Sequence, residues 1–139
     1  MKRLGSIALL LVILSPTLLT TACGASPSND LKMAPMNTLP SKMQNAPTRV
    51  REAYQFAVAN PDALKNVPCY CGCGNIGHTS NYSCYFNEGK KIYDEHALGC
   101  SVCVDIAQDV MKLAREGRSP PDIHAAIVAT YKQFGPPNQ

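Results

Sequence analysis

The sequence contains no tryptophan and no cluster of basic residues. Its 139 residues include 13 Lys or Arg and 10 Asp or Glu, so the charges nearly balance. Without a basic stripe, and without indole rings on which bases could stack, nucleic acid is a poor candidate partner. The sequence also has no internal repeat and no succession of strand and helix patterns that would indicate a βαβ unit.

Apolar residues form a long run only at the N-terminus. Lys2 and Arg3 precede an apolar stretch, residues 4–19, which Pro16 and small or polar residues interrupt. Such a stretch is too short for a permanent membrane span, and with the small residues before Cys23 it indicates a secretory signal over residues 1–22. Without Lys2 and Arg3, 11 basic residues face 10 acidic ones, a net charge near +1.

The segment "LLTTAC" resembles a bacterial lipoprotein signal, in which the cysteine after the cleavage point is lipidated. We therefore expect Cys23 to carry acyl chains, palmitate among them. These chains would anchor the protein to the extracytoplasmic face of a bacterial cell membrane. Plain secretion is the alternative.

Residues 23–47 follow as a predicted linker. They are rich in Pro, Ser, Asn and Ala and show no apolar periodicity. Such a segment buries too little surface to offset its ordering entropy, so we expect a flexible tether. We interpret Met33, Met36 and Met43 as part of this tether rather than as thioether ligands for copper.

The predicted domain covers residues 48–135, with residues 136–139 as a tail. Thr48 is the expected N-cap of a first helix, which ends at Asn60-Pro61, and one further helical turn follows over 61–65. Residues 68–99 show no period except a short hairpin around 84–86 and 92–93. A stretch this long without regular structure is uncommon unless something holds it.

Two clearer helices end the domain. The first has an apolar face at Val102, Ile106, Val110, Leu113 and Ala114 and ends at Gly117. Ser119 caps the second, whose apolar face consists of Ile123, Ile127, Tyr131 and Phe134. We predict a mainly α fold: an N-terminal helix and a C-terminal helical hairpin around an irregular, cysteine-rich loop.

Cysteine and histidine residues are concentrated in this loop and at the start of the following helix. The motif "PCYCGCG" contains three cysteines at alternate positions, and "CSVC" adds a C-x-x-C pair. Thiolate and imidazole are the donors that zinc and Cu(I) prefer, and these spacings let them converge on one ion. We predict a metal site whose ligands are Cys69, Cys71, Cys73, His78, Cys84, His96, Cys100 and Cys103.

The identity and number of the metal ions remain open. A structural site favours zinc, and transfer or sequestration of metal favours Cu(I). Because one tetrahedral ion uses four donors, eight donors allow two ions, a binuclear site, or one ion with spectators.

The cysteines are also compatible with other functions. An exported small domain with six cysteines is also compatible with a disulfide-stapled interaction module, but that leaves His78 and His96 without a role. Cys100 and Cys103 begin a helix, whose dipole lowers the pKa of Cys100, so a thiol–disulfide oxidoreductase acting on exported proteins is the other alternative. No βαβ pattern supports a thioredoxin-like fold for it.

Two further cysteine chemistries fit less well. Hydrolysis by a thiol activated by His124 or His96 lacks an orienting Asn or Asp, and we interpret His124 as a helix-surface residue. Iron–sulfur ligation lacks the plant-type spacing of cysteines. We interpret the protein as a binding protein rather than an enzyme, and an exported protein partner stays open.

Two resemblances add to this interpretation. Over about residues 50–135, "VPCYCGCGNIGH", "SCYF" and "DEHALGCSVC" resemble the bacterial PCYCGC-motif lipoprotein family, which implies export, lipidation and a suspected role in metal binding. The C-terminal third, "CSVC" with "REGRSPPDIHAAIVATYKQFG", is similar to the C-x-x-C helical domain of cytochrome c maturation thiol reductases. That similarity implies a reducing pair at Cys100 and Cys103, but the PCYCGC half has no counterpart there.

Overall fold

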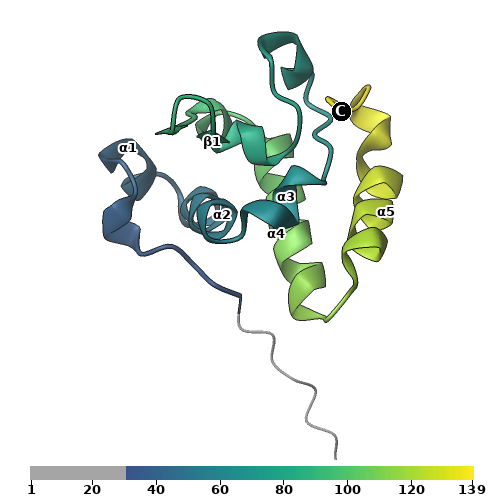
Figure 1. Ribbon diagram of the computed structural model, residues 1–139, viewed down its shortest axis with the longest axis horizontal. Helices are drawn as coiled ribbons and strands as arrows, with labels where there is room; N and C mark the ends of the chain where they lie inside the picture. Colours follow the sequence, from purple (N-terminus) through teal and green to yellow (C-terminus); the bar gives the residue numbers. More distant parts are fainter. Residues whose placement is uncertain (1–30) are drawn as a thin grey trace, which may run out of the picture.

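Helix α4 lies at the centre of the structure, between α2 and α5 (Figure 1). The computed structural model describes residues 31–139, so the predicted signal peptide and Cys23 lie outside the described residues. The longer helices are α2 (Thr48–Ala59), α4 (Ser101–Arg115) and α5 (Pro120–Tyr131), and the short α3 (Pro61–Lys65) follows α2. Between residues 31 and 139, no helix is long and apolar enough to cross a bilayer.

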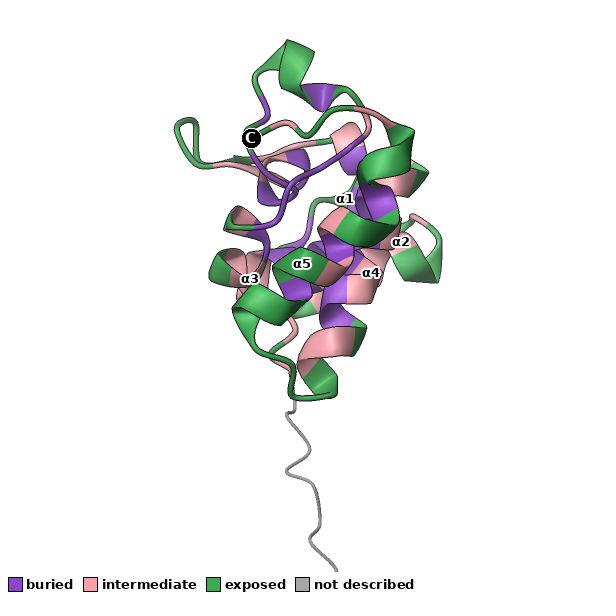
Figure 2. Cartoon of the chain, turned by 90° about the vertical axis from the view of Figure 1, so that its right-hand side faces the viewer, coloured by how far each residue is buried: buried purple, intermediate pink, exposed green. Residues whose placement is uncertain are grey.

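The helical hairpin of α4 and α5 forms as the sequence predicts. Gly117 ends the first helix at φ 74°, and the Ser119 side chain accepts a hydrogen bond from the backbone N–H of Asp122. The outer side of α5 is exposed, green in Figure 2. The sequence predicts that Phe134 belongs to the apolar face of α5, and this is wrong. Phe134 is 56% exposed because it lies beyond the end of α5 in a 3₁₀ turn, Lys132–Phe134.

Helix α4 contributes most of its apolar face to the core. Its buried residues are Cys103, Val104, Ile106, Ala107, Val110 and Met111.

The segment between α3 and α4 is irregular, as expected. It contains 3₁₀ turns η2 (Cys73–Ile76), η3 (Tyr82–Cys84) and η4 (His96–Leu98). The predicted hairpin is present as β1 (Phe86–Asn87) and β2 (Ile92–Tyr93), an antiparallel pair in which Phe86 lies opposite Tyr93. The prediction of a small, mainly α domain around a cysteine-rich loop is therefore confirmed.

The prediction of a flexible linker is wrong for residues 34–47. These residues form η1 (Met36–Thr38) and α1 (Ser41–Gln44) and pack on the domain. Leu39 is 2% exposed and Met43 1% exposed, and the backbone N–H of Ala34 donates to the Gln55 carbonyl at 3.0 Å. The turn η1 contains no buried residue and α1 buries only Met43, so the segment shows no apolar periodicity in the sequence.

The start of α2 also differs from the prediction by one residue. Pro47 is at the N-cap and Thr48 is already helical, without a side-chain capping hydrogen bond. The folded domain thus begins before Thr48.

Candidate metal centre

All eight predicted donors converge where the loop over residues 69–84 meets η4 and the first turn of α4. Their ligand atoms form four overlapping groups, and within each group all atoms lie within 4.8 Å of one another. We call them the outer group (Cys71, His96, Cys100, Cys103), the histidine group (Cys73, His78, Cys84, His96), the motif group (Cys69, Cys71, Cys73) and the buried group (Cys69, Cys84, Cys103). Each group could hold a metal ion.

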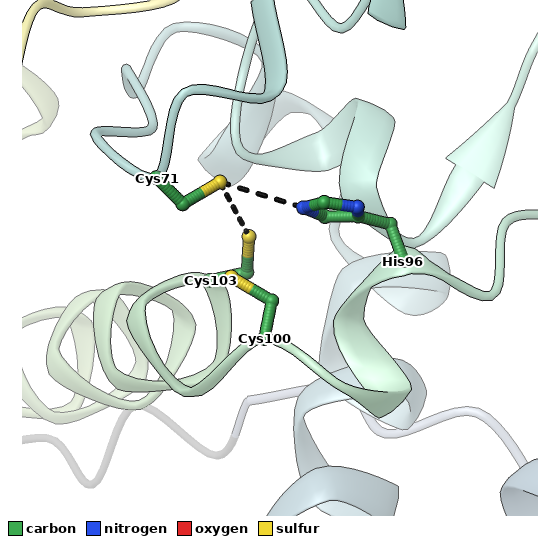
Figure 3. A group of neighbouring side chains, drawn as sticks. All are labelled: Cys71, His96, Cys100 and Cys103. Carbon is green, nitrogen blue, oxygen red and sulfur yellow. Dashed lines mark hydrogen bonds between the residues drawn. The ribbon is translucent and has the colours of Figure 1, made fainter.

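The outer group brings together three separate parts of the chain. Figure 3 shows the Cys71 thiol from the loop and the His96 ring from η4 pointing toward the two cysteines at the start of α4. The Cys71 Sγ lies 3.4 Å from His96 Nε2 and 3.4 Å from Cys103 Sγ. Cys100 is the N-cap of α4, and Cys103 lies one turn later, so both thiols lie on the same side of the helix.

The other groups extend this arrangement into the interior. Cys73 Sγ lies 3.7 Å from Cys84 Sγ in the histidine group. Cys69 Sγ lies 3.4 Å from Cys71 Sγ and 3.3 Å from Cys103 Sγ, and so connects the motif group with the buried group. Among these residues Cys71, His96 and Cys100 are partly exposed, whereas the rest are buried. The cluster therefore has one accessible side, formed by the outer group.

The sulfur–sulfur distances match those around a metal ion better than those of a disulfide. A disulfide bond measures about 2.0 Å. Sulfur atoms around a tetrahedral ion with metal–sulfur bonds of about 2.3 Å lie about 3.8 Å apart. The observed contacts of 3.3–3.7 Å fall near the second value, and the six cysteines of the described residues are thiols rather than disulfides.

Two glycines flank the 3₁₀ turn η2 of the loop. Gly72 has φ 80° and Gly77 has φ 88°, a left-handed conformation that residues with a Cβ rarely adopt. Among the described residues, no atom lies within 4 Å of a Cβ added to either glycine. Glycine is therefore required by the backbone conformation and not by a lack of space for a side chain. Gly72 turns the chain between Cys71 and Cys73 and allows both to face the cluster.

His78 is oriented as a metal ligand would be. Its side chain is buried, its Nε2 lies 3.3 Å from Asp94 Oδ2, and its Nδ1 has no hydrogen-bond partner among the described residues. If Nε2–H donates to the carboxylate, Nδ1 carries the lone pair. A histidine whose other nitrogen donates to a carboxylate is the usual arrangement at metal sites. A buried nitrogen without a partner otherwise costs free energy.

Sequence reasoning missed two residues that support the cluster. Asp94 contacts His78, and its Oδ1 also accepts a hydrogen bond from the backbone N–H of His96 at 2.8 Å. Asn138, in the predicted tail, accepts from the backbone N–H of Cys69 at 2.7 Å and its Nδ2 donates to Cys73 Sγ at 3.3 Å. Asp94 is the first residue of the segment "DEHALGCSVC", but nothing in that segment indicates a contact with His78, and Asn138 belongs to no motif. Neither supporting role could therefore be predicted from the sequence.

The environment of the cluster shifts the pKa values of its thiols in different directions. A hydrogen bond from the Cys103 thiol, assisted by one from its backbone N–H, lowers the pKa of Cys100 to about 5 despite partial burial. Hydrogen bonds from Cys103 and then Cys84 likewise lower the pKa of Cys69. Burial raises the pKa of Cys71 and Cys73. A few thiolates can therefore exist without a cation, but ionising all six in this volume requires positive charge to offset their repulsion.

His124 lies apart from these donors. It is exposed on α5, in agreement with its interpretation as a helix-surface residue. None of the four groups includes it.

Comparison with known proteins identifies the family. Residues 20–139 match the family model described as "Protein of unknown function with PCYCGC motif". The chain belongs to this family. No curated protein and no solved structure matches the chain. The family expected from the motif is thus confirmed, and the similarity to cytochrome c maturation thiol reductases stays a prediction.

Proposed function

We propose that this PCYCGC-family protein is a lipid-anchored binding protein for a soft metal ion, zinc or Cu(I), on the extracytoplasmic face of the bacterial membrane. The observation that carries the proposal is the convergence of six thiols and two imidazoles from separate parts of the chain. Disulfide pairing would give the two histidines no role, whereas metal binding uses both. The buried Nδ1 of His78, which has no hydrogen-bond partner within residues 31–139, supports metal binding.

The exposure of the cluster supports metal handling more than a purely structural site. Partly exposed sites rich in thiolate suit metal exchange, and here the outer group remains partly accessible. A groove of about 370 Å³ lies beside Cys100 and is lined by Pro47, Val50, Leu98 and Val104 among others. A metal ion could reach or leave the cluster through this side. The proposed anchoring rests on the sequence around Cys23.

Replacing Cys71 by serine tests the proposal. Cys71 belongs to both the outer and the motif group, so Cys71→Ser should lower the bound metal per chain and the thermal midpoint together. Elemental analysis and thermal unfolding of chains purified anaerobically without chelators measure both quantities. The matched control is His124→Ala, which lies outside the cluster and should change neither. A Cys71→Ser protein that keeps the metal content and stability of the original chain contradicts the proposal.

A second candidate function is supported by the properties of the C-x-x-C pair. Cys100 is partly exposed with a lowered pKa, whereas Cys103 is buried with a raised pKa, an asymmetry typical of thiol–disulfide oxidoreductases. This candidate predicts that Cys100→Ser abolishes reduction of a disulfide substrate and that Cys71→Ser does not. An insulin reduction assay on both variants separates the two functions.

A further inference from the structure

The four donor groups are not independent sites, because every two of them share one side chain. The outer group shares Cys71 with the motif group and Cys103 with the buried group. The shared side chains are Cys69, Cys71, Cys73, Cys84, Cys103 and His96. Ions in neighbouring groups would therefore have to be bridged by common ligands, and separate mononuclear sites cannot all be filled.

The chemistry of the shared ligands decides which of them can bridge. A thiolate sulfur has several lone pairs and can bind two ions, whereas a neutral imidazole nitrogen has only one lone pair. Five of the shared ligands are cysteines and can bridge. His96 serves a single group, and its Nε2, 3.4 Å from Cys71 Sγ, places it in the outer group. The histidine group then retains Cys73, His78 and Cys84.

This assignment leaves one group with four donors and three groups with three donors each. Zinc in protein sites is almost always four-coordinate, so it fits only the outer group without added ligands. Cu(I) prefers thiolate donors, and three-coordinate Cu(I) needs no fourth ligand. The motif and buried groups supply three sulfurs each, and the buried group has no exposed member. The donor set therefore favours copper.

Building on the proposed function, we propose that the cluster binds four Cu(I) ions, one in each group, bridged by the five shared cysteine thiolates. Cys100 and His96 are terminal ligands of the outer group, and His78 is the terminal ligand of the histidine group. Each group contains one of the observed short sulfur–sulfur contacts, so the sulfurs already lie within bridging distance. Four monovalent ions offset four of the six thiolate charges, and the protons lost from the thiols pass to solvent.

Anaerobic titration with Cu(I), followed by native mass spectrometry, tests the cluster. The probe is Cu(I) alone, delivered from a competing chelator to the full-length chain carrying Cys23→Ser, which removes the seventh thiol. The expected spectrum contains mainly the metal-free and the four-copper protein, because bridging makes binding cooperative. Independent uptake of one or two ions overturns the cluster but leaves the proposed function in place. A chain that binds neither Cu(I) nor Zn²⁺ overturns both.

Two variants separate bridging from terminal ligands. Cys69 belongs only to the motif and buried groups, so Cys69→Ser should lower the copper content from four ions to two and leave zinc binding by the outer group intact. Cys100 is terminal, so Cys100→Ser leaves that group three donors and should retain four ions. If the outer group is instead the single metal site, the reverse is expected. Cys69→Ser should then leave the copper content unchanged, and Cys100→Ser should weaken copper binding.

Circular dichroism checks that both variants fold. If Cys69→Ser does not fold, the Cys100→Ser stoichiometry decides alone: four ions support the cluster and fewer overturn it.

Discussion

Asp94 shows how a single residue organises the site. Its carboxylate contacts His78 and the backbone N–H of His96, and its backbone carbonyl accepts a hydrogen bond from the Tyr54 hydroxyl at 2.8 Å. The carboxylate thus orients the His78 imidazole and fixes the backbone of His96, while the carbonyl connects the site to α2. A metal-bound histidine gains basicity and a fixed orientation from such a carboxylate.

Replacing Asp94 by asparagine should weaken metal binding. The amide keeps the shape of the side chain but removes the negative charge beside His78, so we expect metal affinity to fall about 10–100-fold. Competition with a chromophoric chelator measures the affinity. Glu95→Gln is the matched control, because the Glu95 carboxylate is exposed and pairs with Lys42 at the surface. Equal affinities for the two variants would show that Asp94 does not act on the metal ligands.

Asn138, in the last residues of the sequence, stabilises the cysteine motif in its middle. Besides its bonds to Cys69 and Cys73, its side chain donates to the Ser80 carbonyl at 3.2 Å. Asn138→Ala leaves these partners unsatisfied, so the free energy of unfolding of the metal-free protein should fall by about 1–3 kcal/mol. Urea unfolding under reducing conditions measures it, with Gln139→Ala as the control. A change no larger than that of the control would assign the tail no role in the fold.

At the scale of elements, residues 34–47 are the part of the fold that the sequence did not predict. Met43 on α1 is buried against the core, although its surroundings in the sequence are polar and rich in proline. Met43→Ala should lower the free energy of unfolding by about 2–5 kcal/mol, because it leaves a cavity in the core. Denaturant unfolding of Met43→Ala and of exposed Ser41→Ala provides the comparison. If both variants are as stable as the original chain, the segment is not packed on the domain.

Three tyrosines join the helices to their neighbours. The Tyr85 hydroxyl donates to the Cys103 carbonyl at 2.7 Å, the Tyr131 hydroxyl donates to Asp109 at 2.8 Å, and the Tyr54 hydroxyl donates to Asp94. Burial raises the pKa of all three above the ordinary tyrosine value. These hydroxyls therefore stay protonated in the folded state at a pH where the unfolded chain would already lose their protons.

This shift predicts cooperative unfolding at alkaline pH. Since the folded state binds more protons, the free energy of unfolding is unaffected by these groups below a pH of about 10 and falls as the pH rises further. The ultraviolet absorbance of these three phenolates should therefore appear together with the loss of helical circular dichroism. Tyr131→Phe, which cannot ionise, should move this transition to higher pH. Ionisation of all tyrosines near their ordinary pKa with the helices intact would contradict the prediction.

At the scale of the whole molecule, the fold class and the donor residues were predictable for different physical reasons. The hairpin of α4 and α5 has regular apolar spacing and clear caps at Ser119 and Gly117, which are local properties. The donors were predictable because zinc and Cu(I) prefer sulfur and imidazole over other side chains. The overlap of the four groups, the role of Asp94 and the packing of Met43 depend on contacts between distant residues. No local sequence pattern predicts such contacts.

The central claim is that a soft metal ion lies among the six thiols and two imidazoles. Its most direct test is elemental analysis of the full-length chain purified anaerobically without chelators, combined with alkylation of the cysteines before and after chelation. We expect bound zinc or copper, and thiols between Cys69 and Cys103 that resist alkylation until the metal is removed. A metal-free protein whose thiols are all alkylated at once, or are joined in three disulfides, would contradict it.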